Sequence, residues 1–387
     1  MRVLLLTAEY PPQPGGVGDY TAELAAALAA QDVAVAVLTG VGEGQDSGAF
    51  PVWRRVRNWG RRLRSDVQSA MTEWGADLLH IQYQTGAFQM KPAINMLPSR
   101  LDAPTVVTMH DLHMPYLAPK VAPLRRYVTR LLIESCRAVV VTNAEDQARL
   151  LGVAPVTGDP DLYALSQPLT PPPVLIPIGV NIAVHPAPDR AALRQGLGLP
   201  ADGILVAYFG LLNHTKGVHT LIEALQYVPE TTHVVIIGGG AHTPEDAEYA
   251  DVVRATIKRL DMAGRVHWTG YLSAEDVSRT LQAADLAALP FTDGASYRRG
   301  SLLATLAHGL PTITTPPHLT LEPALRDDHE VLLVDAGDAI NLALAIERLT
   351  LDADLRTTLA GRGRSLVDSF RWDAIAAQHR DLYGKIG

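Results

Sequence analysis

The sequence predicts an α/β protein made of two doubly wound domains, and two observations lead to this prediction. Short apolar runs of strand length alternate with segments of helical period along the 387-residue chain, which is typical of parallel sheets covered by helices on both faces. A proline-rich stretch, residues 166–188, interrupts the alternation. Because the chain exceeds the length at which one core usually keeps growing, we expect two domains, residues 1–180 and 181–370.

The expected strands are short and mostly apolar, as in a sheet covered on both faces. They are residues 2–7, 33–38, 78–81, 105–109 and 139–142 in the first half, and residues 204–209, 234–237, 266–268, 286–289, 312–314 and 330–334 in the second. In open α/β sheets, ligands bind beyond the carboxyl ends of the strands. Functional residues are therefore expected in the loops that follow these strands.

The composition of the chain indicates what kind of ligand it binds and in which cellular compartment it is expected. The net charge of -8 argues against a general nucleic-acid binder and favours a small molecule. Cys136 is the one cysteine, which excludes an internal disulfide and a cysteine-cluster metal site, and makes the cytoplasm the default expectation. The N-terminal apolar run is short and interrupted by Glu9, so it reads as a strand and not as a signal peptide.

A glycine-containing loop joins the first strand to an alanine-rich helix that runs to about Ala30. Gly15, Gly16 and Gly18 occupy three of four positions there. Glycines between a strand and a helix allow a ligand or another backbone segment to come close. A tight turn without a ligand would also explain them.

Two histidines lie on strands of the first half. His110 follows the strand 105–109, where an imidazole can bond a sugar hydroxyl or assist proton transfer. His80 has apolar neighbours on both sides, which favours a hydrogen-bonded structural role. The spacing of His110 and His113 invites a metal interpretation, but no carboxylate or cysteine set accompanies it, so we expect no metal there. The pair Asp159 and Asp161 lies in a loop rich in proline and glycine, where it is expected to shape a turn.

The segment Trp53 to Arg64 is the one concentrated run of basic residues. Val52, Val56, Trp59 and Leu63 are spaced four, three and four apart, so an amphipathic basic helix is expected. Its arginines would be solvated on a helix docked on the sheet, or would contact an anionic membrane surface or an acidic acceptor.

The stretch Asp285 to Thr314 reads as a strand, a loop and a helix. Arg298 and Arg299 end the loop, and Gly300 and Ser301 begin the helix. Free amides at a helix start attract anions, phosphate above all. A surface loop with solvated arginines is the plain alternative. Lys216, at the start of the helix after the strand 204–209, would add a third cation, and together these groups form a plausible diphosphate clamp.

Several motifs, in this order and spacing, resemble the retaining family 4 glycosyltransferases of the GT-B fold. The similarity covers nearly the whole chain and includes a last helix, about residues 371–387, which in such enzymes packs back onto the first domain. The motifs are Gly15-Gly16-Val17, His110, Ile176-Pro177-Ile178-Gly179-Val180-Asn181, Lys216-Gly217-Val218, Gly270-Tyr271, Ala284-Asp285-Leu286 and Ala307-His308-Gly309-Leu310-Pro311.

This resemblance implies transfer of a sugar from a nucleotide diphosphate sugar, held mostly by the second domain, to an acceptor hydroxyl bound by the first. It implies that Gly15 and Gly16 approach the donor phosphate and sugar, that His110 meets a sugar hydroxyl, and that Lys216 binds the diphosphate. Gly270 and Tyr271 are the candidates for contact with the nucleotide base. No metal or other cofactor is implied, because cationic side chains and helix-end amides stabilise the leaving phosphate. An acceptor in surface polysaccharide or glycolipid synthesis is the expectation.

The chain departs from the family pattern at three positions. Ser296 and Ala304 stand where the family has two glutamates eight residues apart, and Leu211 stands where it has an arginine. We expect Arg298 or Arg299 to supply the missing cation, and Ser296 to offer a sugar hydroxyl only a neutral partner. The loss of both acids keeps a second hypothesis open, a non-catalytic GT-B protein acting as a partner or regulatory subunit. A third, nucleotide-sugar epimerisation, lacks a supporting pair of acids.

Overall fold

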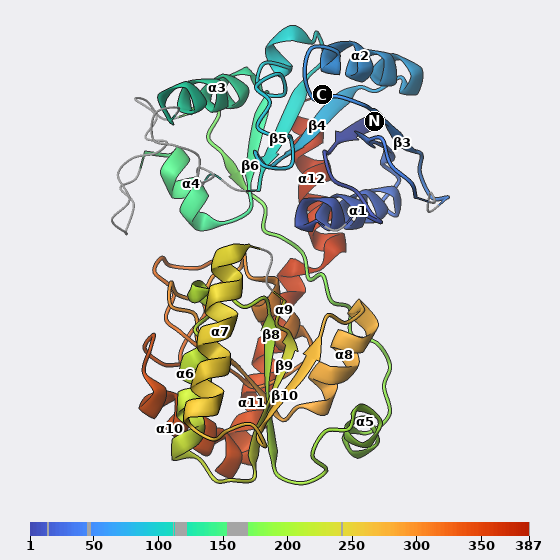
Figure 1. The fold of residues 1–387 in the computed structure, drawn as a ribbon. Helices are drawn as coiled ribbons and strands as arrows, with labels where there is room; N and C mark the ends of the chain where they lie inside the picture. The colour runs from blue at the N-terminus through green and yellow to red at the C-terminus, as the bar shows by residue number, and fades with distance from the viewer. Residues whose placement is uncertain are drawn as a thin grey trace. The chain divides into compact units, whose positions relative to one another are not determined.

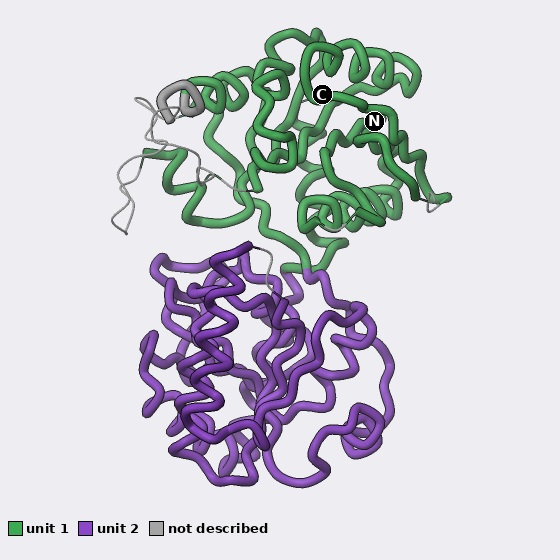
Figure 2. The backbone as a smooth tube through the Cα atoms, in the orientation of Figure 1, with its two compact units in different colours: residues 1–179, 370–387 green, residues 180–369 purple. Residues whose placement is uncertain are grey.

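The computed structural model describes residues 1–13, 15–44, 48–110, 112, 122–152, 169–240 and 243–386. Within it the chain divides into two compact units (Figure 2). Unit 1 comprises residues 1–179 and 370–387, and unit 2 comprises residues 180–369. Each unit is built on a parallel sheet with helices on both faces, so the predicted pair of doubly wound α/β domains is confirmed.

The sheet of unit 1 has seven parallel strands in the order β3-β2-β1-β4-β5-β6-β7 in the described part of the chain. The order reverses direction beside β1, and in such sheets a ligand site lies at the carboxyl edge near this reversal. The strands are β1 (Arg2–Leu6), β2 (Ala34–Gly40), β3 (Val52–Val56), β4 (Leu78–Tyr83), β5 (Thr105–Met109), β6 (Ala138–Val141) and β7 (Val174–Leu175).

Alternate residues of these strands point to opposite faces, so two hydrophobic clusters form. Val3 and Leu5 pack with α1 (Gly16–Ala29) and α12 (Trp372–Ile386), which lie side by side on one face (Figure 1). Leu4 and Leu6 pack on the other face with α2 (Leu63–Trp74) and α3 (Ala122–Ser135). The C-terminal helix α12 is therefore part of the core of unit 1. Helix α4 (Ala144–Leu150) completes this unit.

Unit 2 has a six-stranded parallel sheet in the order β10-β9-β8-β11-β12-β13 among the residues described. Its strands are β8 (Ile204–Gly210), β9 (Thr232–Gly238), β10 (Val266–Gly270), β11 (Leu286–Leu289), β12 (Thr312–Thr314) and β13 (Leu332–Leu333). Its helices are α5 (Arg190–Leu197), α6 (Val218–Ala224), α7 (Pro244–Arg259), α8 (Ala274–Ala283), α9 (Gly300–Ala307), α10 (Ala339–Leu351) and α11 (Ala353–Val367). All neighbouring strands run parallel, so the loops that follow β8, β10 and β11 share one edge of the sheet.

The helix predicted over Trp53 to Arg64 is wrong. Val52–Val56 is the strand β3, paired in parallel with β2, and α2 begins only at Leu63. A spacing of four residues places Val52 and Val56 on one face of a strand as well as of a helix, so the pattern did not separate the two. Between the elements the Gly60 N–H donates to Asn58 Oδ1 over 2.7 Å, which closes a turn at this glycine.

Within the described residues, none of the helices combines the length and the apolar character that crossing a membrane requires.

Candidate active site

Two loops of unit 2 are fastened together at the carboxyl edge of its sheet. The Thr292 N–H donates to Thr215 O over 3.1 Å, and the Thr292 hydroxyl donates to His214 O over 3.1 Å. Gly217 has a φ of +62°, and a Cβ at this position would lie 1.9 Å from Pro290 O. The glycine therefore allows the loop after β8 to lie directly against the loop after β11.

This docking brings three basic side chains together, Lys216, Arg298 and Arg299, which we call the cation cluster. Lys216 Nζ lies 5.2 Å and Arg299 Cζ lies 4.1 Å from the centre of the Phe291 ring. The aromatic face attracts both cations and holds them at one place. Arg299 is also paired with Asp293, while its Nε is buried without a hydrogen-bond partner. Phe291 and Asp293 were not recognised from the sequence.

Within the described part of unit 2, the cation cluster carries more positive charge than the Asp293 carboxylate beside it balances. Burial lowers the pKa of Lys216 to about 8, with Arg299 and Arg298 lowering it further and Asp293 opposing them. Burial is also the main cause that lowers the pKa of Arg299. Because three cations lie near one carboxylate, a doubly charged anion bound between these two loops would stabilise the excess positive charge.

Helix α9 begins beside the cation cluster. Its first amides, those of Gly300 and Ser301, have no preceding helical turn to bond to, and a Cβ on Gly300 would meet nothing within 4 Å. The Arg298 N–H donates to Ser296 Oγ over 3.3 Å, so Ser296 lies at this same helix start. Ala304 is fully buried in the core, where it cannot reach a ligand.

Gly270 and Tyr271 lie at the same edge of the sheet, after β10. Gly270 has a φ of +68°, which turns the chain away from the strand, and the Tyr271 side chain is 96% exposed. Two strands, β9 and β8, separate β10 from β11 in the sheet order. Both residues therefore follow a strand at the carboxyl edge of the sheet, and the Tyr271 ring lies in solvent.

The glycine loop of unit 1 is shaped by close contacts. A Cβ on Gly15 would lie 2.1 Å from Glu9 Oε2, and one on Gly18 would lie 3.0 Å from the backbone of Glu9 and Tyr10. A Cβ on Gly16 would meet nothing within 4 Å, so this position is open. Glu9 was not recognised from the sequence. Burial, and secondarily Asp19, raises the pKa of the Glu9 carboxyl.

His110 lies at the carboxyl end of β5, as predicted. Its Nε2 is 2.8 Å from Gln82 Oε1, and the Tyr20 ring meets it edge-on with the ring centres 4.6 Å apart. Burial, together with the neighbouring His379, lowers the pKa of His110 to about 3. The imidazole is therefore neutral at pH 7, able both to donate and to accept a hydrogen bond.

His80 has the structural role that its apolar neighbours predict. It is fully buried, with Nδ1 at 2.6 Å from the Tyr383 hydroxyl of α12 and Nε2 at 2.7 Å from the Thr108 hydroxyl. Both ring nitrogens are satisfied within the core, which confirms the structural interpretation.

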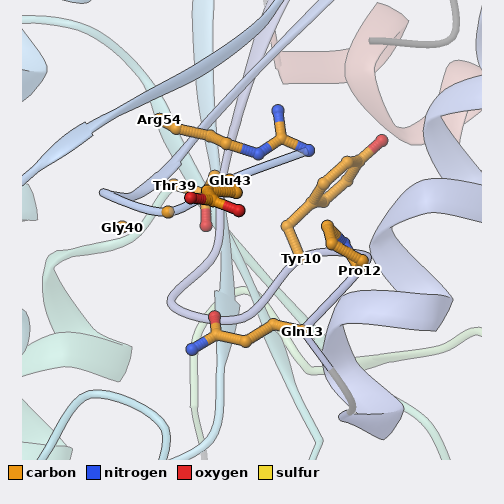
Figure 3. Close-up of a pocket in the computed structure, with 8 residues that line it drawn as sticks. Tyr10, Pro12, Gln13, Thr39, Gly40, Glu43 and Arg54 are labelled. Carbon is orange, nitrogen blue, oxygen red and sulfur yellow. The ribbon is translucent and has the colours of Figure 1, made fainter. Parts of the chain in front are cut away.

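A hollow of about 260 Å³ opens in unit 1 at the carboxyl ends of β1, β2 and β3 (Figure 3). Arg54 of β3 donates to Pro11 O over 2.8 Å, and its guanidinium lies 5.6 Å from the centre of the Tyr10 ring. The lining combines an aromatic face with charged and amide side chains, a mixture that suits a polyhydroxylated ligand. Its residues are Tyr10, Pro12, Gln13, Thr39, Gly40, Gly42, Glu43 and Arg54. Sequence reasoning missed this hollow because it assigned Arg54 to a helix.

Among the described residues, no group of three or more histidine, cysteine, aspartate or glutamate side chains is placed to hold a metal ion. His113, Asp159 and Asp161 lie outside the described residues.

Comparison with known families matches both halves of the chain. The family described as "Glycosyl transferases group 1" matches residues 189–366, and the "Glycosyl transferase 4-like domain" matches residues 15–157. The chain is 26% identical over 414 residues to alpha-maltose-1-phosphate synthase of Mycolicibacterium smegmatis, with all of both chains covered. It is 28% identical over 303 residues to D-inositol 3-phosphate glycosyltransferase of Xylanimonas cellulosilytica, which covers 74% of this chain and 67% of that protein.

Among solved structures, the Anabaena protein HepE in complex with UDP superposes with a TM-score of 0.75 and 19% identity, and covers 100% of both chains. At this identity the likeness concerns the fold alone. Both parallel-sheet units have their counterparts in that structure, so the expected GT-B architecture is confirmed.

Proposed function

Because the chain is a glycosyltransferase of the GT-B fold that uses a nucleotide sugar donor, we propose that its cation cluster binds the donor diphosphate. The observation that carries this proposal is the convergence of Lys216 and Arg299 on the Phe291 ring, beside the first amides of α9. Two cations and a helix N-terminus match the two charges of a diphosphate. Arg299 would then replace the arginine that the family has at the position of Leu211.

The same groups would stabilise the charge that develops on the leaving diphosphate. Charge-assisted hydrogen bonds from Lys216 and Arg299 strengthen as the glycosidic bond breaks, which is the form of stabilisation that lowers a barrier. On this proposal the reaction proceeds without a metal ion and retains the anomeric configuration, as in family 4. Activity that persists in EDTA, and an anomeric proton coupling in the product that matches the donor, are the expected results.

In unit 1, we assign sugar hydroxyls to the glycine loop and to His110. Gly16 is open to a ligand, while the Glu9 carboxyl beside Gly15 suits a hydroxyl better than a second phosphate. A neutral His110 can bond a sugar hydroxyl through Nδ1, the ring nitrogen that its contact with Gln82 leaves free. Ser296 of unit 2 would meet another hydroxyl of the donor sugar, and Gly270 with Tyr271 would contact the base, Tyr271 by stacking once a ligand covers it.

The hollow beside Arg54 is the proposed acceptor site. Its carboxylate, guanidinium, amide and aromatic groups fit an acceptor with several hydroxyls, such as a growing saccharide. A related chain of Rhizobium meliloti, 32% identical over 192 residues that span 49% of this chain and 52% of that one, is a lipopolysaccharide core biosynthesis glycosyltransferase. We propose surface polysaccharide or glycolipid synthesis as the setting, in the cytoplasm.

We also propose that the segment after β3 contacts an anionic membrane surface. It does so as a turn and the start of α2, because the expected basic helix does not form. Arg57, Arg61, Arg62 and Arg64 are exposed around the turn that follows β3. Exposed arginines on one segment attract anionic headgroups, each residue by roughly 1 kcal/mol near the surface. Co-sedimentation with vesicles containing phosphatidylglycerol, and its loss when these four arginines are replaced by glutamine, would test the contact.

A panel of nucleotide sugars tests the proposed function. The purified protein is incubated with UDP-, GDP- and ADP-linked hexoses, and release of the nucleoside diphosphate is followed with wild type and with His110→Ala. We expect release from at least one donor by wild type and its loss in the variant. Binding of a nucleotide without turnover of any donor, with or without saccharide acceptors, would favour the non-catalytic alternative.

A further inference from the structure

Gln82 is a buried amide at the end of β4 that contacts His110. It is fully buried, and its Oε1 lies 2.8 Å from Nε2 of His110. Its Nε2 lies 3.3 Å and 3.4 Å from the two ring nitrogens of His80. The side chain therefore bridges the histidine at the sheet edge and the histidine in the core.

The chemistry of the amide decides which nitrogen of His110 carries the proton. A carbonyl oxygen can only accept a hydrogen bond, so the 2.8 Å contact requires a proton on His110 Nε2. A neutral imidazole has one N–H, and therefore Nδ1 keeps a free lone pair. Fixed in this way, His110 offers an acceptor and not a donor at Nδ1.

The core holds Gln82 in this orientation through His80. Tyr383 and Thr108 occupy the two nitrogens of the His80 ring with contacts of 2.6 Å and 2.7 Å. Turning the Gln82 amide over would place its carbonyl oxygen against this ring and its NH₂ against His110. All four side chains, Gln82, His80, Thr108 and Tyr383, are fully buried, so water does not compensate for a lost partner.

We propose that Gln82 is a positioning residue that holds His110 in the Nε2–H tautomer, so that Nδ1 accepts a hydrogen bond from a hydroxyl of the donor sugar. The inference rests on the proposed function for the sugar contact, whereas the tautomer itself follows from the arrangement of unit 1 alone. His110 is partly exposed, which gives a ligand access to the ring.

Among the described residues, three further titratable groups face His110 or Gln82. They are Tyr20 of α1, whose ring meets His110 edge-on, His80 of β4, and His379 of α12. Burial also lowers the pKa of His80 and of His379, so both are neutral at pH 7. Neither histidine then competes as a cation for the Gln82 carbonyl.

Two substitutions separate the positioning role from a structural one. Gln82→Leu removes the acceptor and leaves the buried Nε2–H without a partner, so the proton is expected to move to Nδ1, where solvent can accept it. Gln82→Glu keeps the acceptor and adds a negative charge, which should raise the pKa of His110 and favour the imidazolium. Thr108→Val is the matched control, because it alters the same buried network on the far side of His80 and leaves the contact between Gln82 and His110 in place.

The test is nitrogen-15 NMR of the full chain labelled at histidine. Wild type and Thr108→Val should show a proton-bearing Nε2 and a bare Nδ1 on His110 at pH 7. Gln82→Leu should show the proton on Nδ1, and Gln82→Glu should titrate at a higher pH than wild type. A wild-type ring with the proton on Nδ1, or a Gln82→Leu ring unchanged from wild type, would overturn the assignment.

The proposed contact between His110 and the donor sugar is tested by a separate measurement of turnover. With a donor that the protein turns over, Gln82→Glu should lower kcat about tenfold or more at pH 6, with recovery at higher pH as the imidazolium loses its proton, while the donor KM changes little. A pH-independent loss would contradict the proposal and indicate a structural role. Affinity for UDP, measured by calorimetry on the same variants, reports on unit 2, so failure of the diphosphate site is distinguishable from failure of this inference.

Discussion

Replacement of Arg299 by alanine removes a largely buried charge from the cation cluster. The Arg299 side chain is 12% exposed, so its hydrogen bonds to a phosphate would be worth about 1.5–3 kcal/mol. In the free protein Arg299 is already paired with Asp293, whose side chain is 48% exposed. A pair of that exposure contributes about 0.2–1 kcal/mol, and binding of the ligand breaks it. The net loss is about 0.5–2.8 kcal/mol, so the affinity for UDP should fall about 2- to 110-fold.

Isothermal titration with UDP, GDP and ADP measures this effect directly. Asp293→Asn should act in the opposite direction and tighten binding by about 0.2–1 kcal/mol, because it removes the competing carboxylate. Arg254→Ala, an exposed arginine of α7 paired with Asp251, is the matched control and should change nothing. Unchanged UDP affinity in Arg299→Ala would refute the proposal that the cation cluster binds the diphosphate. Weaker UDP binding by Asp293→Asn would refute the proposal that Asp293 competes with the diphosphate for Arg299.

Three further outcomes are expected. Affinity for UDP should fall as the pH rises from 7 to 9, because Lys216, with a pKa of about 8, loses the positive charge that attracts the diphosphate. An affinity that does not change with pH would show that Lys216 does not bind the diphosphate. His110→Ala should lower donor turnover by about 100-fold or more with UDP affinity unchanged in calorimetry, and a loss of UDP affinity would contradict the division of roles between the units. Gly217→Ala should lower the melting temperature by about 3–10 °C, because it forces a Cβ against Pro290 O at positive φ. Gly361→Ala, where a Cβ meets nothing within 4 Å, is the control. An unchanged melting curve for Gly217→Ala would show that the loops after β8 and β11 can separate without loss of stability.

The fold was predictable where a strand is buried on both faces. Residues 105–109, 286–289 and 312–314 are strands with the predicted limits, because each is a short run of β-branched or apolar residues between loops. The edge of the sheet was not predictable in this way. Strand β3 is only partly buried and carries three consecutive side chains, Trp53, Arg54 and Arg55, whose pattern also fits a helix, while β7 is a two-residue strand inside a proline-rich stretch.

The candidate site was predictable at the level of chain position and not of side-chain partners. Lys216 and Arg299 could be found because each follows a strand at a glycine-containing turn. Phe291 and Asp293 could not, since their roles depend on which loop docks against which, and this is fixed by the Thr292 and Gly217 contacts. Gln82 was missed for the same reason, because its contact with His110 depends on the pairing of β4 with β5.

A crystal structure of the full chain with UDP tests the central claim most directly. We expect phosphate oxygens within about 3.2 Å of Lys216 Nζ and of the Arg299 guanidinium, with the first amides of α9 facing the same phosphates and Asp293 displaced from Arg299. A diphosphate bound elsewhere, with the pair of Arg299 and Asp293 intact, would contradict the account.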